Sequence, residues 1–371
     1  MKLLVAVLGT ALVLLVLRDA FETVVLPRRV RRFFRLTSIF YRASWYMWRG
    51  VARRFKGVVR EVSLSTFGPL SLLLLLALWA FGIVLGFGAL HWAAGSTLVM
   101  PGQSPGFLDD LYLSGTTFFT LGLGDVTPGD ATAKVLTVIE SGLGFAFLAI
   151  IISYLPVIYQ AFSRREISIS MLDARAGSPP GAGELLRRNP IDADPDGLSR
   201  LLGEWERWSA EILESHLSYP VLAYYRSQHG NQSWLAALAT VLDTSALVMV
   251  GCEGPCARQA RFTFAMARHA VVDLAQVFSA RRPRSLALRI SETDLARLAH
   301  ELGAAGARFD SANARARFVE LRMMYEPYLT ALSEHLVLPV PGWSRHPEHR
   351  DNWEAAPWKD FSAKAKPPEH F

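Results

Sequence analysis

Long apolar runs alternate with polar segments along the first half of the chain, and two of these runs are clear membrane spans. Residues 62–90 contain no charged side chain, and residues 135–162 contain only Glu140. A helix needs roughly 20 mostly apolar residues to cross the hydrocarbon core of a bilayer. Both runs are therefore predicted to be transmembrane helices.

A third run, residues 3–26 within the segment 1–27, is less uniform. Its uninterrupted apolar part ends at residue 17, so a full span must include Arg18, Asp19 and Glu22. Arg18 and Glu22 are four positions apart and can pair on one helix face. The alternative is a cleaved signal peptide, because Lys2 precedes the apolar run, but the small-residue cleavage site is missing. We predict a first transmembrane helix.

The segment 28–62 between the first two spans is strongly basic. Residues 28–60 hold ten Arg, one Lys and no Asp or Glu, although the net charge of the whole chain is only +6. A basic, aromatic segment between two spans is predicted to lie at the interface against anionic headgroups rather than on nucleic acid. The alternative is that its charge serves only to fix the topology. The interleaved aromatic residues are Phe33, Phe34, Tyr41, Trp45, Tyr46, Trp48 and Phe55.

The same charges predict the orientation. Cytoplasmic loops are enriched in Lys and Arg, so residues 28–60 are placed in the cytoplasm. The N-terminus is then outside, residues 94–131 form an external loop, and the third span returns inward. Arg164 and Arg165 follow that span at its inner end, which leaves the C-terminus cytoplasmic.

The external loop contains a short apolar segment, residues 107–119, that is predicted to be helical. Asp109 and Asp110 lie at its start, where the helix dipole favours negative charge. The segment is too short to span a bilayer. Between two true spans it indicates a re-entrant helix, which is tolerated where protein or a water-filled cavity surrounds it.

The residues directly after this segment can present a row of carbonyl oxygens to a cation. In an extended chain the carbonyls alternate in direction, so every second residue must be left-handed for the oxygens to line up. Only glycine adopts that conformation at low cost, and Gly122 and Gly124 occupy alternate positions. The candidate filter residues are Thr120, Leu121, Gly122, Leu123, Gly124 and Asp125.

Residues 117–128 resemble the potassium-channel pore signature, T-x-G-Y-G-D followed by a proline. The resemblance covers about residues 67–162 and is closest to the two-transmembrane pore module of bacterial potassium channels and to pore regions of two-pore-domain channels. It implies that residues 120–123 supply the coordinating oxygens and that Asp125 anchors the outer mouth. It further implies a homotetramer in a bacterial inner membrane, with permeant K⁺ and no cofactor.

Two positions depart from the signature. Leu121 stands where Val or Ile is usual, and Leu123 stands where Tyr is most common. The hydroxyl that would tether the filter to the pore helix is therefore missing at Leu123. A weakly selective monovalent cation channel stays open as an alternative to a potassium-selective one.

The third span is predicted to line the pore as the inner helix. Gly142 and Gly144 interrupt it, and Gly144 lies near the place where the family has its gating hinge. Close packing through small residues is the alternative reading. Pro156 is expected to kink or loosen the cytoplasmic end. Glu140 is an intramembrane carboxylate with either a direct functional role or a hydrogen-bonding role behind the filter.

The second half of the chain is predicted to be an all-α cytoplasmic domain. Residues 163–197 are rich in Pro, Gly and Asp and are assigned to a linker, residues 198–336 to the helical domain, and residues 337–371 to an irregular tail. Candidate helices run over 198–216, 234–250, 257–278, 292–302 and 311–335. The predicted fold is an all-α membrane protein with three transmembrane helices, a pore module at 63–162, and this domain.

The helical domain carries no sequence signature of an enzyme or of a nucleotide-binding domain. It has no G-x-G-x-x-G after a strand and no Walker motif. Cys252 and Cys256 make only half of a zinc site, so reduced cysteines are expected, and His216, His269 and His300 are expected to be ordinary helix residues. The domain is expected to regulate the channel, and the sequence does not indicate which ligand it binds. A membrane-anchored signalling or scaffold protein with a degenerate pore is the alternative function.

Overall fold

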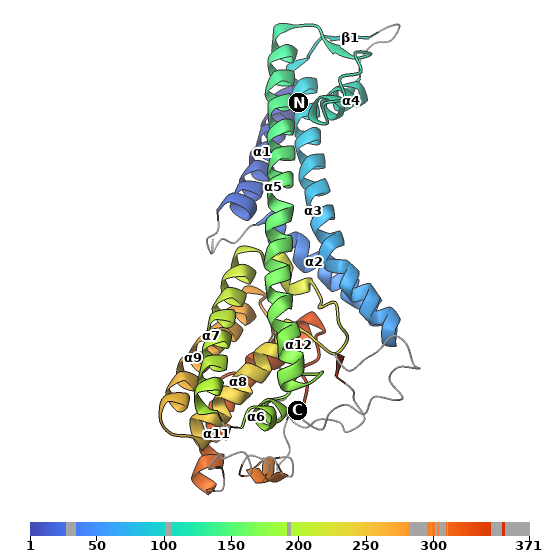
Figure 1. Ribbon diagram of the computed structural model, residues 1–371. Coiled ribbons are helices and arrows are strands. Elements are labelled where there is room, and N and C mark those ends of the chain that lie inside the picture. The colour runs from blue at the N-terminus through green and yellow to red at the C-terminus, as the bar shows by residue number, and fades with distance from the viewer. Residues whose placement is uncertain are drawn as a thin grey trace, which may run out of the picture. The chain divides into compact units, whose positions relative to one another are not determined.

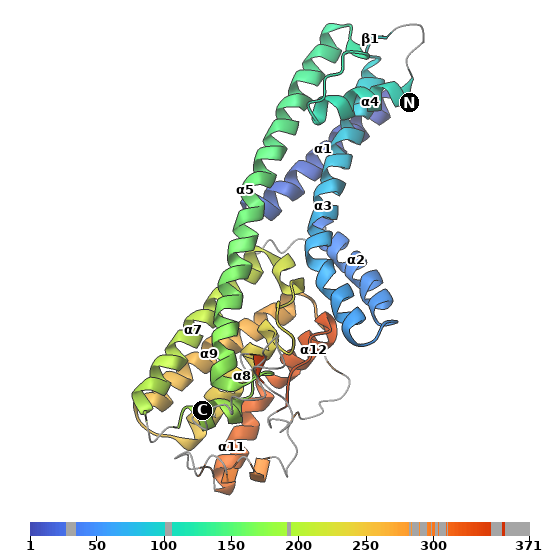
Figure 2. The same ribbon diagram turned by 45° about the vertical axis from the view of Figure 1, so that its right-hand side comes forward.

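The computed structural model describes residues 1–26, 35–100, 106–190, 194–281, 311–342 and 351–352, together with residues 283, 289, 295–297, 299, 300, 303 and 309. The chain divides into two compact units, Met1–Gln160 and Ala161–Phe371 (Figures 1 and 2). The described part is all-α, as predicted, apart from two short strands. Part of the basic segment and most of the expected helix 292–302 lie outside the described residues.

The core of the first unit lies between α1 (Lys2–Ala20) and α3 (Gly57–Ala94). Both helices are apolar on all sides, and they come close together where Gly9 and Gly86 face each other. A Cβ at Gly86 would meet the Val13 side chain, so only glycine fits there. Trp79 and Ile83 of α3 are almost completely buried in this core.

Charged residues at the end of α1 have specific partners. Arg18 and Glu22 form the expected ion pair, with 3.0 Å between Nε and Oε1. The buried Asp19 carboxylate accepts hydrogen bonds from the backbone N (3.1 Å to Oδ2) and hydroxyl (2.5 Å) of Thr37 and from Trp79 Nε1 (2.9 Å). Thr37 lies in the first turn of α2 (Leu36–Ala52), where helix N–H groups lack partners of their own. Asp19 therefore caps α2 from another helix, which explains a carboxylate in an apolar run.

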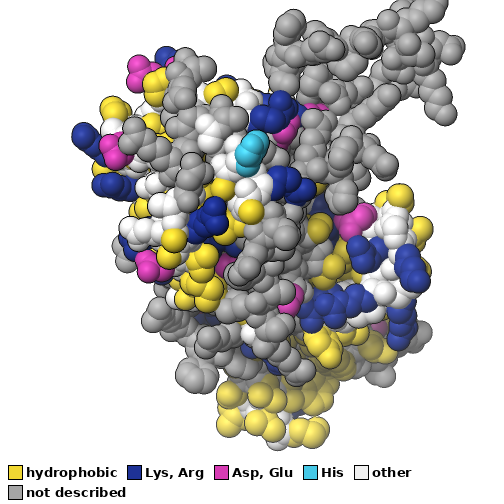
Figure 3. All heavy atoms as spheres, turned by 90° about the horizontal axis from the view of Figure 1, so that it is seen from below, with side chains coloured by type: hydrophobic (Ala, Val, Ile, Leu, Met, Phe, Trp, Pro, Cys, Tyr) yellow, Lys and Arg dark blue, Asp and Glu magenta, His cyan; other side chains and the backbone are white. Residues whose placement is uncertain are grey.

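Helix α2 folds back on the start of α3 through aromatic side chains. The rings of Trp45 and Phe67 are 4.8 Å apart, and Trp48 Nε1 donates to the Ser63 carbonyl at 2.9 Å. The cations of this hairpin gather on its turn, on the right-hand side of Figure 3. Exposed cations there are Arg53, Arg54, Lys56 and Arg60.

Two short strands and an acidic cap hold the ends of the loop between α3 and α5 (Ala131–Ala176). Strand β1 (Leu98–Val99) pairs antiparallel with β2 (Thr127–Pro128). Asp130 accepts hydrogen bonds from Thr97 N at 2.5 Å and from Ala133 N in the first turn of α5 at 2.9 Å. These backbone hydrogen bonds, first from Ala133 and then from Thr97, lower the pKa of Asp130 to about 2. The strands were not predicted, since two-residue strands leave no pattern in the sequence.

Four described helices are long and apolar enough to cross a membrane: α1 with the turn that follows it (Lys2–Val25), α3, α5 and α8 (Trp234–Gly251). The first three contain the three predicted spans. Helix α8 was instead predicted within the helical domain, and 89% of its apolar window is buried inside that unit. In α5 only 17% of the window is buried, so α5 exposes most of its apolar side chains in a single chain.

The second unit is a bundle built around α8. Helix α9 (Pro255–Val277) packs along α8, and α7 (Pro195–Ser218) packs along α9. Around them lie α6 (Ala182–Arg188), α11 (Ala312–Met323) and α12 (Glu326–Leu336) (Figure 1). A short 3-10 helix, Pro220–Tyr224, follows α7. The predicted helices 198–216, 234–250 and 257–278 correspond to α7, α8 and α9.

Arg165, expected only as a topology charge, is buried in this bundle. Its guanidinium donates to the carbonyls of Leu222 at 2.8 Å and Tyr225 at 2.7 Å. It also lies 3.4 Å from Nε2 of the buried His216. Burial, and next the charge of Arg165, lower the pKa of His216 well below its ordinary value. His216 is therefore a neutral core residue, whereas His269 and His300 are exposed.

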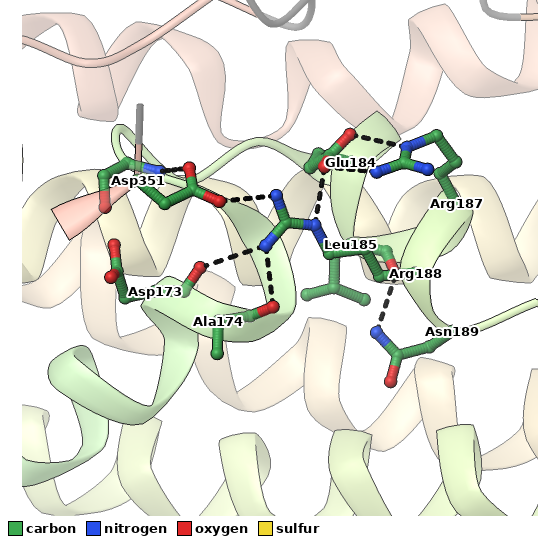
Figure 4. Close-up of polar contacts among 9 residues, drawn as sticks. Asp173, Ala174, Glu184, Leu185, Arg187, Arg188, Asn189 and Asp351 are labelled. Carbon is green, nitrogen blue, oxygen red and sulfur yellow. Dashed lines mark hydrogen bonds and ion pairs between the residues drawn. The ribbon is translucent and has the colours of Figure 1, made fainter. Parts of the chain in front are cut away.

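A second buried arginine connects the end of α5 to the tail (Figure 4). Arg188 donates to the Ala174 carbonyl at 2.7 Å, to Glu184 at 2.5 Å and to Asp351 Oδ2 at 2.6 Å. Asp351 also accepts from Ser178 N at 3.0 Å. The tail was predicted to be irregular, yet the buried Asp351 joins this network over a separation of 163 residues from Arg188.

Two predictions about the helical half are wrong. Residues 163–176 are not a linker: α5 continues to Ala176, because Ile169 and Leu172 bury their side chains in the second unit. A Pro- and Gly-rich break does follow at residues 177–181, before α6 begins at Ala182. The predicted helix 311–335 is two helices, α11 and α12, and Pro327 in the first turn of α12 accounts for the break.

Candidate functional site

The candidate site begins with α4 (Phe107–Phe118), the short helix predicted between the two spans. Asp109 Oδ2 accepts a hydrogen bond from the backbone N of Gly106 at 2.7 Å, which fixes the N-terminal turn. The side chains of Leu113, Ser114 and Phe118 are buried against the rest of the first unit. One face of α4 is therefore anchored, and its C-terminal end is held in one place.

A Schellman motif ends α4 and directs the chain into the candidate filter. Leu121 N donates to the Thr116 carbonyl at 2.8 Å, and Thr120 N donates to the Thr117 carbonyl at 3.0 Å. Thr120, the first residue after the helix C-cap Phe119, has a φ of 57°. Glycine is usual at this position of the motif. A threonine held there carries backbone strain of about 1–3 kcal/mol, and such strain concentrates at functional sites.

The left-handed conformation recurs at alternate residues. Gly122 has a φ of 55° and Gly124 a φ of 80°, so the positive φ predicted for these two glycines is confirmed. A Cβ on either would meet no atom within 4 Å. The backbone conformation, rather than space, therefore explains why these residues are glycines. Thr120 extends the alternation by one step, which the sequence did not predict because threonine seldom adopts a positive φ.

A tyrosine of α4 tethers the far end of this segment. Tyr112 donates from its hydroxyl to Oδ2 of Asp125 at 2.8 Å. From the sequence, only the missing hydroxyl at Leu123 was apparent, and Tyr112 was not predicted to replace it. The available signal was an aromatic hydroxyl near the start of the short helix, thirteen residues before Asp125. The tether to the helix thus comes from outside the filter motif.

The two leucines of the segment project away from the rest of the chain. Leu121 is 62% exposed and Leu123 is 65% exposed. Contiguous exposed apolar patches mark surfaces that contact a membrane or another protein. The polypeptide of a single chain leaves both of them uncovered.

The glycines and the proline predicted to bend α5 lie in different surroundings. A Cβ on Gly144 would clash with the carbonyl oxygen of Phe118, whereas a Cβ on Gly142 would meet nothing within 4 Å. Gly144 therefore permits close packing of α5 on the end of α4. Helix α5 continues through Pro156 to Ala176 without interruption.

Glu140 lies in the first unit behind α4 and is completely buried. Its Oε1 is hydrogen-bonded to the hydroxyl of Ser114 of α4. Of the two roles considered for Glu140, this geometry corresponds to hydrogen bonding behind the candidate filter. Helix α4 thus contacts α5 at two places. Ser114 is hydrogen-bonded to Glu140, and the Phe118 backbone packs closely on Gly144.

The remaining candidate residues lie in the second unit, away from this segment in sequence. Cys252 is partly buried and Cys256 is buried. Burial raises the pKa of Cys256 above its ordinary value. Within the described part of the chain, no group of three or more His, Cys, Asp or Glu side chains is arranged to hold a metal ion.

Residues 73–160 match a family model described as an ion channel. The resemblance predicted from residues 117–128 is therefore confirmed for this stretch, which we call the channel module. It comprises most of α3, all of α4, the segment 120–125 and α5 as far as residue 160.

Among curated proteins, the chain is similar to the uncharacterized membrane protein YdjJ of Bacillus subtilis (strain 168). The two are 28% identical over 204 residues, which cover 54% of this chain and 58% of YdjJ. The chain thus spans little more than half the length of this relative. No solved structure matches at a significant level. Together the comparisons support an ion-channel function in a membrane protein.

Proposed function

We propose that the chain is a subunit of a tetrameric potassium channel whose filter is the segment 120–125. One observation carries the proposal: positive φ angles alternate at Thr120, Gly122 and Gly124, directly after a short helix. This alternation turns successive carbonyl oxygens toward one side of the chain. A row of such oxygens replaces the hydration shell of a permeant cation.

The exposed surfaces of the channel module support assembly around an axis. A single segment cannot enclose an ion, whereas four segments related by rotation can. Helix α5, the proposed inner helix, leaves Phe145, Leu148 and Ile152 exposed by 53–70%. Leu121 and Leu123 are exposed in the same unit. In the proposed tetramer, neighbouring subunits and lipid cover these side chains.

In the proposed topology, α1, α3 and α5 cross the membrane and α4 is re-entrant. The N-terminus is outside and the helical unit is cytoplasmic, because the cations of residues 35–60 flank the start of α3. A tag at residue 1 should be accessible from outside in intact cells, and a tag at residue 371 only after permeabilisation. Equal accessibility of both tags would rule this topology out.

The deciding experiment is ion flux through the purified protein in liposomes. Potassium and sodium gradients of equal size should give fast potassium flux and slow sodium flux, and native mass measurement in lipid should give four chains. Equal fluxes would instead favour the second candidate, a weakly selective monovalent cation channel. Leu123 motivates this candidate, since it lacks the hydroxyl that a tyrosine would supply to the filter. No flux of either ion would leave the signalling or scaffold alternative.

The role of the helical unit is a separate proposal. Its buried network of Arg188, Glu184 and Asp351 lies directly beyond the last turn of α5. We propose that this unit regulates the channel module through α5. Anionic lipids are the proposed partners of the basic turn between α2 and α3, where Phe55 and Val58 are exposed beside the cations.

A further inference from the structure

A completely buried polar cluster joins three helices of the channel module behind the filter segment. Glu140 of α5, Ser114 of α4 and His91 of α3 each have 0% of their surface exposed. Polar groups buried this deeply are costly unless they are hydrogen-bonded. Each hydrogen-bond donor in the cluster therefore has to be matched with an acceptor, and this requirement limits which groups can be protonated.

The hydrogen-bond partners of Ser114 indicate the protonation state of Glu140. The Ser114 hydroxyl lies within hydrogen-bond distance of two oxygens, the Val84 carbonyl at 2.8 Å and Glu140 Oε1. A backbone carbonyl and an ionised carboxylate can only accept, and a hydroxyl has one hydrogen to donate. Both bonds form together only if Glu140 is protonated: Glu140 then donates to Ser114, and Ser114 donates to Val84.

The other carboxyl oxygen has no compensating partner. Glu140 Oε2 faces His91 Nε2 at 3.9 Å, beyond hydrogen-bond distance, and neither atom has a hydrogen-bond partner within the described residues. The second ring nitrogen, Nδ1, lies 3.3 Å from the Ser96 hydroxyl. Loss of the proton would therefore leave a buried carboxylate with a single donor, unless His91 took up the proton.

The other charged groups near the cluster come from each neighbouring element. Asp130, before α5, acts on His91, and its carboxylate stays ionised because its pKa is about 2. Asp110 of α4 is also buried, and its Oδ1 has no hydrogen-bond partner in the described structure. Asp109 and Lys2 act on Asp110. None of these groups lies within hydrogen-bond distance of the Glu140 carboxyl.

The cluster is placed to control the filter. Ser114 lies in α4, and the Schellman motif that leads into Thr120 begins two residues later at Thr116. The protonated form links α4 to α3 through Val84 and to α5 through Glu140. When Glu140 is ionised, Ser114 can donate to only one of the two, and one link is lost. The position of α4 and of the filter then has less support.

We propose that Glu140 is a proton-binding positioning residue whose protonated form holds α4 and keeps the filter conductive. The inference rests on the proposed channel function. It predicts that conduction falls as the pH rises through the range in which Glu140 ionises. It also predicts that the proton is needed only as a hydrogen-bond donor to Ser114.

The test is potassium flux through full-length protein in liposomes between about pH 6 and about pH 9. Each pH unit above the titration point lowers the protonated fraction about tenfold, so wild-type flux should fall by about the same factor for each pH unit above that point. Glu140→Gln keeps an N–H donor for Ser114 and cannot titrate, so its flux should be retained and independent of pH. Glu204→Gln, a change of an exposed glutamate in α7, should behave as the wild type does. A Glu140→Gln protein with the wild-type pH profile would overturn the proposal.

Two readouts do not depend on conduction. The infrared spectrum of the wild type minus that of Glu140→Gln should show a protonated-carboxyl band that disappears with rising pH, since the subtraction removes the contribution of the buried Asp110. Thermal unfolding in detergent should shift to lower temperature with rising pH in the wild type and not in Glu140→Gln. Absent flux with these signals present would overturn the proposed channel function but not proton binding by Glu140. A difference spectrum without the band would overturn the inference whatever the flux.

Discussion

The hydroxyl of Tyr112 and Oδ2 of Asp125 are 2.8 Å apart and join the first half of α4 to the far end of the proposed filter, residues 120–125. The short helix also holds the near end of the segment, through the Schellman motif at Thr120. The six residues 120–125 are thus fixed at both ends by the same helix. The Tyr112 hydroxyl thus ties α4 to this segment, although Leu123 carries no hydroxyl.

Removing the Tyr112 hydroxyl should loosen the outer end of the filter. We expect Tyr112→Phe to keep the fold, because only a hydroxyl is lost from an exposed ring, and to lower the ratio of potassium to sodium flux several-fold. Flux through liposomes with matched gradients measures the effect. Tyr46→Phe, which removes the hydroxyl of an exposed tyrosine in α2, is the control. Unchanged selectivity in Tyr112→Phe would show that the hydrogen bond does not support the filter.

Gly124→Ala should abolish conduction without preventing assembly. The φ of 80° at Gly124 disfavours any side chain by about 1–2 kcal/mol, or about 4–8 kcal/mol if four subunits add. No atom lies within 4 Å of the added methyl group, so the helices around it are undisturbed. Flux and native mass should be compared with Gly50→Ala in α2, where a methyl group also meets nothing within 4 Å. Normal potassium flux in Gly124→Ala would place the conduction path elsewhere.

A matched pair of substitutions separates packing from hinge motion in α5. Gly144→Ala introduces a methyl group against the Phe118 carbonyl, and overpacking of this kind costs about 1–3 kcal/mol. Gly142→Ala adds the same methyl group in open space. We expect only Gly144→Ala to lower the thermal stability of the detergent-solubilised protein. Equal stability of the two variants, together with altered gating in both, would favour a hinge.

The buried arginine at the end of α5 should contribute strongly to the stability of the second unit. Arg188→Gln removes the Arg188 cation from Asp351, which is 1% exposed, and from Glu184, which is 9% exposed and keeps its pair with Arg187. Breaking a buried ion pair costs about 3–5 kcal/mol. Arg317→Gln breaks an exposed i,i+3 pair and should cost at most about 1 kcal/mol. Denaturant unfolding of the two variants measures both values. Similar losses in the two variants would contradict a stabilising role for the network.

The same network predicts how the second unit responds to acid. Burial opposes ionisation of Glu184, but hydrogen bonds from Arg187 and Arg188 outweigh it and lower the pKa from the ordinary value of 4.5 to about 2. The stabilisation is therefore complete above pH 4.5 and is lost as the pH falls toward 2. Glu184→Gln should flatten this part of the curve of stability against pH. A wild-type curve that does not change over this range would contradict the predicted shift.

The sequence by itself determined the features that depend on neighbouring residues. Apolar length indicates spans in α3 and α5, and the alternation of Gly122 and Gly124 indicates positive φ, because both are requirements on a short stretch of backbone. The ends of α8 and α9 were also predictable, since turn-forming residues flank continuous apolar or amphipathic runs. The channel resemblance rests on the same local motif.

Only the tertiary structure decided which side chains meet across the chain. Tyr112 with Asp125, Ser114 with Glu140 and Ser178 with Asp351 are separated by 13, 26 and 173 residues. No periodic pattern in the sequence predicts such pairs, because each pair depends on how whole helices pack. The linker assigned from residue 163 failed for the same reason. Burial of Ile169 and Leu172 against the second unit extends α5 through residues whose local composition does not require a helix.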